Sequence, residues 1–563
     1  MTRVSAGLFH QPLHPIGGVL ATTVIALVPI AVLLILLAAL RMAAWKAVII
    51  GAVVTVLLGI TLWSAPAAGT AKAWLAGAGT GIWAIDWITL WGVIFYNTIV
   101  VTGAFDDFKR WLVDKATLDI RVQTILLAWS LGALLEGLVG FGYPWAVVTP
   151  ILIGMGVVEL DAIRVAAIAN NAPVSFGALG VPIIALAAVT GIPLMHLSQS
   201  IGRIVAVLAL APPWILIVLV TGRRGLRDGW PLAVVGSLSY IAGQYPTSQY
   251  LGPYLPDVVG SLTSFGALLL LLRFWRPSVV LGYGGVPVEP IPSAASLGGR
   301  HSARVPATSG QGRPVPAAGR PAATGSAPLR GLLPFLVLLV VVVAWTGPWS
   351  TLPKFNLFKY SVDAISSLSQ KKAEVAFVFN PGAGGTSIMA AWLVSLAFLR
   401  PSGAQLGKAL STTFSQMWGA LLVGPFIFGL ADAFNYTGMA NSLAYGFSRI
   451  GTPFILLSAI LGFIGVALSG SNTATNAVFG NFQMTVGRLL HFPLLLAPSL
   501  NSVGAEVGKP IAPQTASVGV STSAFVRREG DVIRHNFGWT LAILAYLVVI
   551  GLLYFFLFPS AMA

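Results

Sequence analysis

Long apolar stretches separated by short polar loops run through most of the chain. Most of these stretches approach the roughly 20 residues that a helix needs to cross a bilayer. The pattern predicts about 12–14 membrane elements and hence an all-α polytopic membrane protein. Their limits are 18–40, 43–63, 73–104, 123–157, 162–190, 201–220, 258–272, 331–345, 377–399, 409–430, 453–487, 490–520 and 537–558. Residues 105–121, which mix apolar and charged side chains, predict an amphipathic helix on the membrane surface.

Two stretches in the second half are interrupted by small, polar, glycine-rich sequence. The first interruption lies in 468–483 and the second in 501–514. Serine, asparagine and glycine there leave a helix with unpaired backbone groups that lipid cannot satisfy, so this backbone must be buried in protein or line a cavity. We therefore expect a re-entrant hairpin over 453–487 and a broken helix over 490–520. Interrupted helices of this kind hold ions and anions near the bilayer midplane in secondary transporters.

The same arrangement occurs once earlier, at a constant offset of 330 residues. Gly140 aligns with Gly470, and Asn171 aligns with Asn501. Paired interruptions in two halves of a chain are typical of inverted repeats that surround a transport site. The alternative is that small residues are simply common in helical membrane proteins. The register shared by the two copies favours the repeat.

The interruptions divide the chain into two membrane halves joined by a polar linker. Residues 1–275 form the first half, with a re-entrant hairpin over 123–157 and a broken helix over 162–190. The hairpin arms, of about 15 residues each, are too short to span a bilayer. Residues 331–563 form the second half. Between the halves, 276–330 is basic, rich in Pro and Gly, and without apolar periodicity, which predicts a disordered cytoplasmic loop.

Composition agrees with a membrane protein and excludes several other classes. The 563 residues are 56% hydrophobic and 9% charged, whereas ordinary soluble chains are about 25% charged. The net charge of +15 is spread over loops between apolar stretches, as the positive-inside rule predicts for the cytoplasmic membrane. The expected partner is therefore the lipid bilayer and not a nucleic acid. The absence of cysteine excludes disulfides and thiol chemistry.

Few acidic residues lie inside apolar sequence, and these are functional candidates because an ionisable group is costly there. Glu136 and Glu506 each adjoin a break, where a proton can bind and be released, and we assign them to proton coupling. Asp86 and Asp432 are weaker candidates. Lys509 follows Glu506 by three residues, so its ammonium either pairs with a substrate carboxylate or neutralises Glu506.

Polar side chains and small residues at the breaks complete the candidate site. The expected substrate-binding residues are Asn170, Asn171, Ser175, Ser471, Asn472, Thr473, Asn476, Asn501, Ser502, Lys509 and Gln514. The expected backbone positions of the breaks are Gly140, Gly142, Pro144, Gly177, Gly470 and Gly508. Half-helix N-termini at such breaks favour anions. The histidines show no metal-binding spacing and no Ser-His-Asp arrangement, so we expect no metal, no cofactor and no enzymatic activity.

Together these motifs resemble the lactate permease family. The matching pieces are Glu136-Gly-x-x-Gly-Phe-Gly-x-Pro144, Ala172-Pro-Val-x-Phe-Gly-Ala-Leu-Gly-x-Pro182, Gly470-Ser-x-Thr473, Asn476-Ala-x-Phe-Gly-Asn481, Asn501-Ser502 and Gly508-Lys-x-Ile-x-Pro-Gln514. The resemblance covers both halves and implies carriage of 2-hydroxy monocarboxylates, such as lactate and glycolate, with protons. The chain departs from the family pattern at Asn472, which is usually Asp, and at Glu506, which is usually apolar.

The Ser-Asn-Thr run at 471–473 is also similar to the hairpin signature of dicarboxylate carriers. That similarity implies an inverted-repeat fold, a homodimer and elevator-like motion. We therefore expect a secondary active transporter that imports a small 2-hydroxy monocarboxylate by proton symport. A sodium-coupled or dicarboxylate carrier of the same fold is the nearest alternative. A membrane-embedded enzyme would need a reactive constellation, and a passive channel would conduct without counterflow, so both are less favoured.

Overall fold

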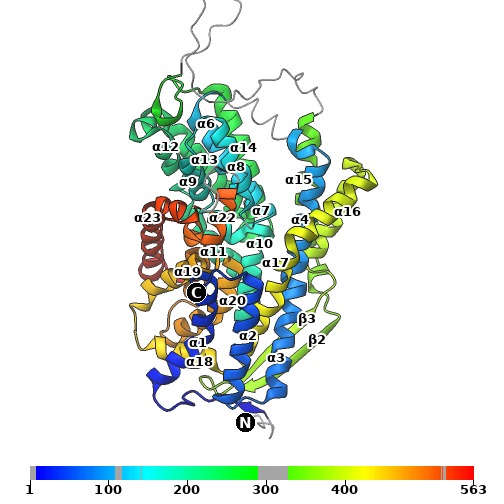
Figure 1. Cartoon of the computed structure of the whole chain (residues 1–563), viewed down its shortest axis with the longest axis vertical. Coiled ribbons are helices and arrows are strands. Elements are labelled where there is room, and N and C mark those ends of the chain that lie inside the picture. Colours follow the sequence, from blue (N-terminus) through cyan, green and yellow to red (C-terminus); the bar gives the residue numbers. More distant parts are fainter. Residues whose placement is uncertain (1–7, 108–116, 141, 289–326, 522, 524–527) are drawn as a thin grey trace, which may run out of the picture.

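The computed structural model of the chain describes residues 8–107, 117–140, 142–288, 327–521, 523 and 528–563. Helices form most of this part of the chain (Figure 1). Within it, seven helical stretches are long and apolar enough to cross a membrane, and a bent pair adds an eighth candidate. The prediction of a polytopic helical membrane protein is confirmed. Much of the predicted surface helix at 105–121 and of the predicted loop at 276–330 lies outside the described residues.

Both halves contain short and long helices. Those of the first half are α1 (Val19–Ala38), α2 (Ala44–Thr61), α3 (Ala67–Thr80), η1 (Gly81–Asp86), α4 (Trp87–Val101), α6 (Ile120–Thr124), η2 (Ile125–Leu131), α7 (Gly132–Leu138), α8 (Tyr143–Gly154), α9 (Glu159–Ala169), η3 (Val174–Phe176), α10 (Gly177–Thr190), α11 (Leu194–Leu208), α12 (Pro212–Thr221), η4 (Arg223–Gly225), α13 (Leu226–Tyr250), α14 (Pro256–Phe274) and η5 (Tyr283–Gly285). Those of the second half are α15 (Ala327–Thr346), η7 (Leu352–Lys354), α16 (Gly384–Leu399), α17 (Gly403–Thr437), α18 (Met439–Ser448), α19 (Phe454–Ser469), α20 (Asn472–Leu489), α21 (Leu496–Gly508), η8 (Lys509–Ile511), α22 (Pro513–Ser521), α23 (Glu529–Phe556) and η9 (Pro559–Met562).

The helix is interrupted within each of the four stretches in which the sequence predicts a break. Between α7 and α8, Gly140 and Gly142 adopt the left-handed conformation, with φ of 67° and 80°. Gly470 does the same between α19 and α20, with φ of 72°. The α9 and α10 helices bend by 67° across η3, and η8 separates α21 from α22. A residue with a Cβ atom would be strained at these left-handed positions, which explains the glycines. The inverted-repeat relation between the halves stays a prediction.

The second hairpin and the second broken helix pack closely because glycines face each other's backbone. A Cβ atom at Gly462 of α19 would lie 2.1 Å from the carbonyl oxygen of Asn501 in α21. One at Gly504 of α21 would lie 2.1 Å from the carbonyl oxygen of Ala459 in α19. Small residues let membrane helices approach in this way. The close packing fixes the hairpin tip relative to η8.

A long helix, α13, lies between the predicted segments 201–220 and 258–272, where the sequence predicts no membrane element. Its 25 residues include Pro231 and Pro246, and Gly, Ser and Gln dilute its apolar pattern. The helix nevertheless packs along α14, where Gly243 brings the two backbones close. Tertiary packing therefore forms a helix that hydropathy alone does not reveal. This helix carries Tyr240, which is fully buried.

A small three-stranded sheet at one end of the molecule departs from the predicted all-α class (Figure 1). Its strands are β1 (Phe9–His10), β2 (Phe358–Ile365) and β3 (Lys372–Phe379). The pairing is parallel between β1 and β2 and antiparallel between β2 and β3. The predicted membrane segment 377–399 is therefore wrong at its start, because β3 ends there and α16 begins only at Gly384. An exposed ion pair, Lys359 with Glu374, crosses the two long strands.

The first residues of the predicted linker fold against the first half. We call residues 276–288 the strap. The Val279 carbonyl accepts a hydrogen bond of 2.9 Å from Arg121, and the Leu281 N–H donates one of 3.0 Å to Asp119. Arg121 and Asp119 themselves form a fully buried ion pair at 2.7 Å. The strap therefore has a defined position, in contrast to the disorder that its composition predicts.

Candidate functional site

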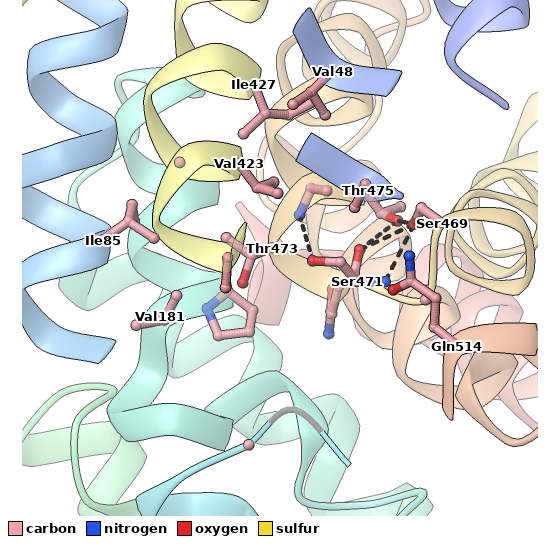
Figure 2. A pocket seen from close by; sticks show the side chains of 18 of the residues that line it. Val48, Ile85, Val181, Val423, Ile427, Ser469, Ser471, Thr473, Thr475 and Gln514 are labelled. Atoms are coloured by element: carbon pink, nitrogen blue, oxygen red, sulfur yellow. Dashed lines mark hydrogen bonds between the residues drawn. The ribbon is translucent and has the colours of Figure 1, made fainter. Parts of the chain in front are cut away.

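A cavity of about 370 Å³ opens between the second hairpin, α7, α10 and η8 on one side and α1, α2, η1 and α17 on the other (Figure 2). The predicted site residues that line it are Glu136, Gly140, Gly177, Gly470, Ser471, Asn472, Thr473, Lys509 and Gln514. The predicted residues that lie outside its lining are Asn170, Asn171, Ser175, Asn476, Asn501, Ser502, Glu506, Gly142, Pro144 and Gly508. The breaks thus supply one wall of the cavity and a polar layer behind it.

Lys509 and Glu136 form a buried ion pair on the cavity wall. The Lys509 Nζ atom lies 2.6 Å from Glu136 Oε1, and both side chains are less than 10% exposed. Asn170 donates a hydrogen bond of 3.1 Å to the other carboxylate oxygen. The pairing corrects one of the two alternatives drawn from the sequence, since Lys509 does not neutralise Glu506. An ion pair this deep holds its partners together strongly, because separating them leaves an uncompensated charge.

Glu506 lies behind the cavity and faces the first broken helix. Its Oε2 atom accepts a hydrogen bond of 3.1 Å from the backbone N–H of Ser175 in η3. Its Oε1 atom has no hydrogen-bond partner among the described residues. The side chain is fully buried, so the structure offers it no direct contact with a molecule in the cavity. Its predicted role in proton coupling remains a proposal.

The hairpin tip presents the start of α20 to the cavity. Ser471 caps the helix by accepting a hydrogen bond from the Ala474 N–H at 3.2 Å, and Thr475 donates back to the Ser471 carbonyl at 2.9 Å. Figure 2 shows Ser469 joining this network. Asn472 is only 5% exposed, yet neither polar atom of its amide has a partner among the described residues. A helix N-terminus beside an unpartnered amide suits an anion.

Several predicted substrate contacts instead bond one another behind the cavity. Asn476 donates to the Pro182 carbonyl at 2.9 Å and to Ser502 at 3.0 Å. Asn501 donates to Asn476 at 2.9 Å and accepts from Gln483 at 2.8 Å. These bonds satisfy buried amides that would otherwise be costly. They tie α10 of the first half to α20 and α21 of the second.

Sequence reasoning missed one buried acid near the ion pair. Asp257, in the first turn of α14, is 1% exposed and accepts a hydrogen bond of 2.8 Å from the Tyr240 hydroxyl. A Cβ atom at Gly137, the neighbour of Glu136, would lie 2.7 Å from Asp257 Cβ. An acid in the first turn of a helix looks like an ordinary electrostatic cap in the sequence. Only recognition of α13, which supplies Tyr240, would have given a signal.

Of the two weaker acidic candidates, only Asp86 lines the cavity. Asp86 lines the cavity from η1, a π-helical turn, and such turns are frequent at functional sites. It stands against α17, where a Cβ atom at Gly424 would lie 2.5 Å from its carboxylate oxygens. Asp432 does not line the cavity. The described residues contain no group of three or more His, Cys, Asp and Glu side chains arranged to hold a metal ion.

The protein is helical and crosses the membrane several times, and an ion pair and a helix N-terminus lie on its internal cavity. This combination is typical of membrane transporters. The family model described as L-lactate permease matches residues 22–559. The chain belongs to the L-lactate permease family, which makes it a multi-pass permease of the cytoplasmic membrane and not an enzyme.

Curated relatives match over nearly the whole chain. The glycolate permease GlcA of Escherichia coli (strain K12) is 33% identical over 569 residues, which cover 98% of both chains. The L-lactate permease of Bacillus subtilis (strain 168) is 31% identical over 568 residues, which cover 96% of this chain and 98% of that relative. Among solved structures, the YdaH transporter of Alcanivorax borkumensis has a TM-score of 0.44 at 14% identity, covering 86% of this chain and 88% of that one.

Proposed function

We propose that the protein imports lactate and glycolate, which are small 2-hydroxy monocarboxylates, together with a proton. The observation that carries this proposal is the buried ion pair of Lys509 and Glu136 on the cavity wall. The names of the relatives, glycolate permease and L-lactate permease, support the substrate class. The geometry of the pair supports the coupling.

The polar wall offers separate partners for the two functional groups of a 2-hydroxy acid. Lys509 is the one cation among the described residues that line the cavity, and an ammonium forms strong charge-assisted hydrogen bonds with a carboxylate. Asn472 has a free amide N–H₂ and a free carbonyl oxygen at the hairpin tip. It can donate to the carboxylate and accept from the 2-hydroxyl group. Thr473 beside it adds a hydroxyl group.

Coupling follows from competition for Lys509. When the substrate carboxylate pairs with Lys509, Glu136 loses its cation while it remains buried. Because an uncompensated buried carboxylate is unfavourable by several kcal/mol, Glu136 takes up a proton as the substrate binds. Asn170 can continue to donate its hydrogen bond to Glu136 Oε2 when Oε1 carries the proton. The empty site and the loaded site then carry the same net charge, and one proton accompanies each anion.

The hydrogen bonds between the halves support an elevator-like motion. The chain of amides ties α10 to α20 and α21, which favours movement of the hairpins and broken helices as one body. The facing wall on α1, α2 and α17 contributes mainly apolar side chains to the cavity, and these make few specific bonds that motion would have to break. The homodimer implied by the family resemblance remains a prediction, which light scattering in detergent can test.

Uptake of labelled L-lactate into proteoliposomes tests the proposal. An inward proton gradient without sodium should accumulate label, whereas voltage alone should not, because no net charge moves. Carrying an unaccompanied charge would involve about 2.3 kcal/mol per 100 mV, so the two cases are readily separated. Glu136→Gln should lose accumulation but retain exchange of internal for external lactate. A requirement for sodium would favour the alternative carrier, and full accumulation by Glu136→Gln would refute the role of Glu136.

A further inference from the structure

The cavity is larger and more apolar than lactate or glycolate requires. Its volume of about 370 Å³ falls within the roughly 300–1,000 Å³ typical of sites for drug-sized ligands. Lactate offers such a site one methyl group, and glycolate offers none. Most of the apolar lining therefore has no partner in the substrates of the proposed function.

The apolar lining faces the polar wall across the cavity. Figure 2 shows Val48 and Ile427 above Ser471 and Thr473, with Val423 between Ile427 and Thr473. Ile427 and Val48 are buried in the helix packing, and Val423 of α17 remains partly exposed to the cavity. A molecule whose carboxylate is held at Lys509 therefore has apolar surface in front of the rest of its chain.

The charges of the lining disfavour a second anionic group on the substrate. Lys509 is the single cation among the described lining residues, and it already serves the first carboxylate. On the far side, Asp86 contributes another acid. A second carboxylate would lose its hydration without gaining a cation, which is unfavourable in a partly dry site. The room in the cavity thus suits an uncharged extension.

We infer that the site also carries 2-hydroxy monocarboxylates with apolar side chains of several carbons, such as 2-hydroxyhexanoate. This inference rests on the proposed function, since it uses the same anchoring of the carboxylate at Lys509. The alkyl chain packs against the exposed part of Val423 and the neighbouring apolar lining. Each additional buried methylene group should strengthen binding roughly fourfold.

Competition and direct entry together test the inference. Counterflow of labelled lactate in proteoliposomes is measured against unlabelled lactate, 2-hydroxybutyrate, 2-hydroxyhexanoate and the dicarboxylate 2-hydroxyglutarate. From lactate to 2-hydroxyhexanoate the half-inhibitory concentration should fall at least about tenfold, and 2-hydroxyglutarate should compete more weakly than lactate. Labelled 2-hydroxyhexanoate must itself enter vesicles that contain unlabelled lactate.

A matched pair of variants locates the effect in the cavity. Val423→Phe fills space beside the polar wall, whereas Val53→Phe makes the same exchange on α2 at a position that is 52% exposed. Val423→Phe should raise the half-inhibitory concentration of 2-hydroxyhexanoate at least about tenfold while that of lactate changes by less than about threefold. Val53→Phe should change neither value.

The outcomes separate this inference from the function on which it rests. If lactate enters but 2-hydroxyhexanoate neither competes nor enters, the inference fails and the proposed function stands. Competition without entry also overturns it, because the acid would then only block the cavity. If labelled lactate does not enter, the proposed function fails. Counterflow of labelled 2-hydroxyhexanoate into vesicles that contain the same unlabelled acid then still decides whether the cavity transports acids with apolar side chains.

Discussion

The Lys509 ammonium lies 2.6 Å from the Glu136 carboxylate, although 373 residues separate the two in the chain. One partner begins η8 in the second half, and the other belongs to α7 in the first. The pair therefore connects the breaks of both halves at the wall of one cavity. A substrate that competes for Lys509 would act on both halves at once.

Lys509→Gln should weaken substrate binding far more than it lowers expression. Gln keeps a hydrogen-bond donor but removes the charge, and loss of a charge-assisted bond of about 2–3 kcal/mol corresponds to a rise of roughly 100-fold in the substrate concentration for half-maximal exchange. The variant also leaves Glu136 buried without its cation, so the melting temperature in detergent should fall.

Two double variants control this result. Glu136→Gln/Lys509→Gln removes both charges and should recover the melting temperature but not the affinity for substrate. Glu506→Gln/Lys509→Gln should recover neither, because Glu506 bonds Ser175 and not Lys509. Recovery of wild-type affinity in either double variant would show that Lys509 does not bind substrate.

Gly177→Ala should uncouple transport partly. A Cβ atom at this position would lie 2.7 Å from Glu136 Oε1, so the carboxylate must shift, and we expect its ion pair with Lys509 to weaken. Because the substrate then competes with a weaker partner, the concentration for half-maximal exchange should fall roughly two- to fivefold, while the accumulation driven by a pH gradient declines. Gly266→Ala in α14 meets no atom within 4 Å and should change neither quantity. Unchanged coupling in Gly177→Ala would argue against competition for Lys509.

Asn472 and Asn476 should respond to alanine in opposite ways. Asn472→Ala removes two polar atoms that have no partner among the described residues, so the melting temperature should stay level or rise while the affinity for substrate falls about tenfold. Asn476→Ala leaves the Pro182 carbonyl and two side chains without their bonds. Its free energy of unfolding should fall by about 1–3 kcal/mol. Equal loss of stability in both variants would contradict a ligand role for Asn472.

Asp257→Asn should leave the melting temperature nearly unchanged. The described residues give Asp257 no ion-pair partner, and a buried charge without one is unfavourable, so a neutral side chain of the same shape fits the site. Tyr240→Phe should instead lower the melting temperature, because it leaves Asp257 Oδ1 without its 2.8 Å hydrogen bond. Thermal melting of both variants in detergent checks the contrast. A large loss of stability in Asp257→Asn would indicate that an anion is required there.

The strap should matter where the remainder of the predicted linker does not. Deleting 276–288 removes the bonds that Arg121 and Asp119 make to Val279 and Leu281, so folded yield and melting temperature should fall. Shortening the chain only within 289–326 should leave lactate uptake near that of the wild type, as its composition predicts. A stable and active variant that lacks the strap would show that these contacts are dispensable.

The sequence was informative wherever the constraint is local. Glycine and asparagine runs inside apolar sequence marked the breaks, because lipid cannot satisfy open backbone, and the chain breaks there. The partner of Lys509 was not accessible, since Glu506 is three residues away in the chain but faces η3, while Glu136 approaches only through the fold. Asn476 and Asn501 look like substrate ligands in the sequence, yet they satisfy each other. Hydropathy does not predict the α13 helix because its apolar pattern is weak. It does not predict the sheet because the apolar pattern of a strand has a period of two.

The pairing of Phe9 with Ala364 in the parallel strands sets an order of events during biogenesis. Residues 355 positions apart must meet, so at synthesis rates of roughly 5–20 residues per second the early strand waits on the order of 20–70 s for its partner. Both strands must also emerge on the same face of the membrane, because a pair cannot form across the bilayer. The small sheet therefore acts as a check on topology. A chain whose insertion leaves the two strands on opposite faces of the membrane cannot close it.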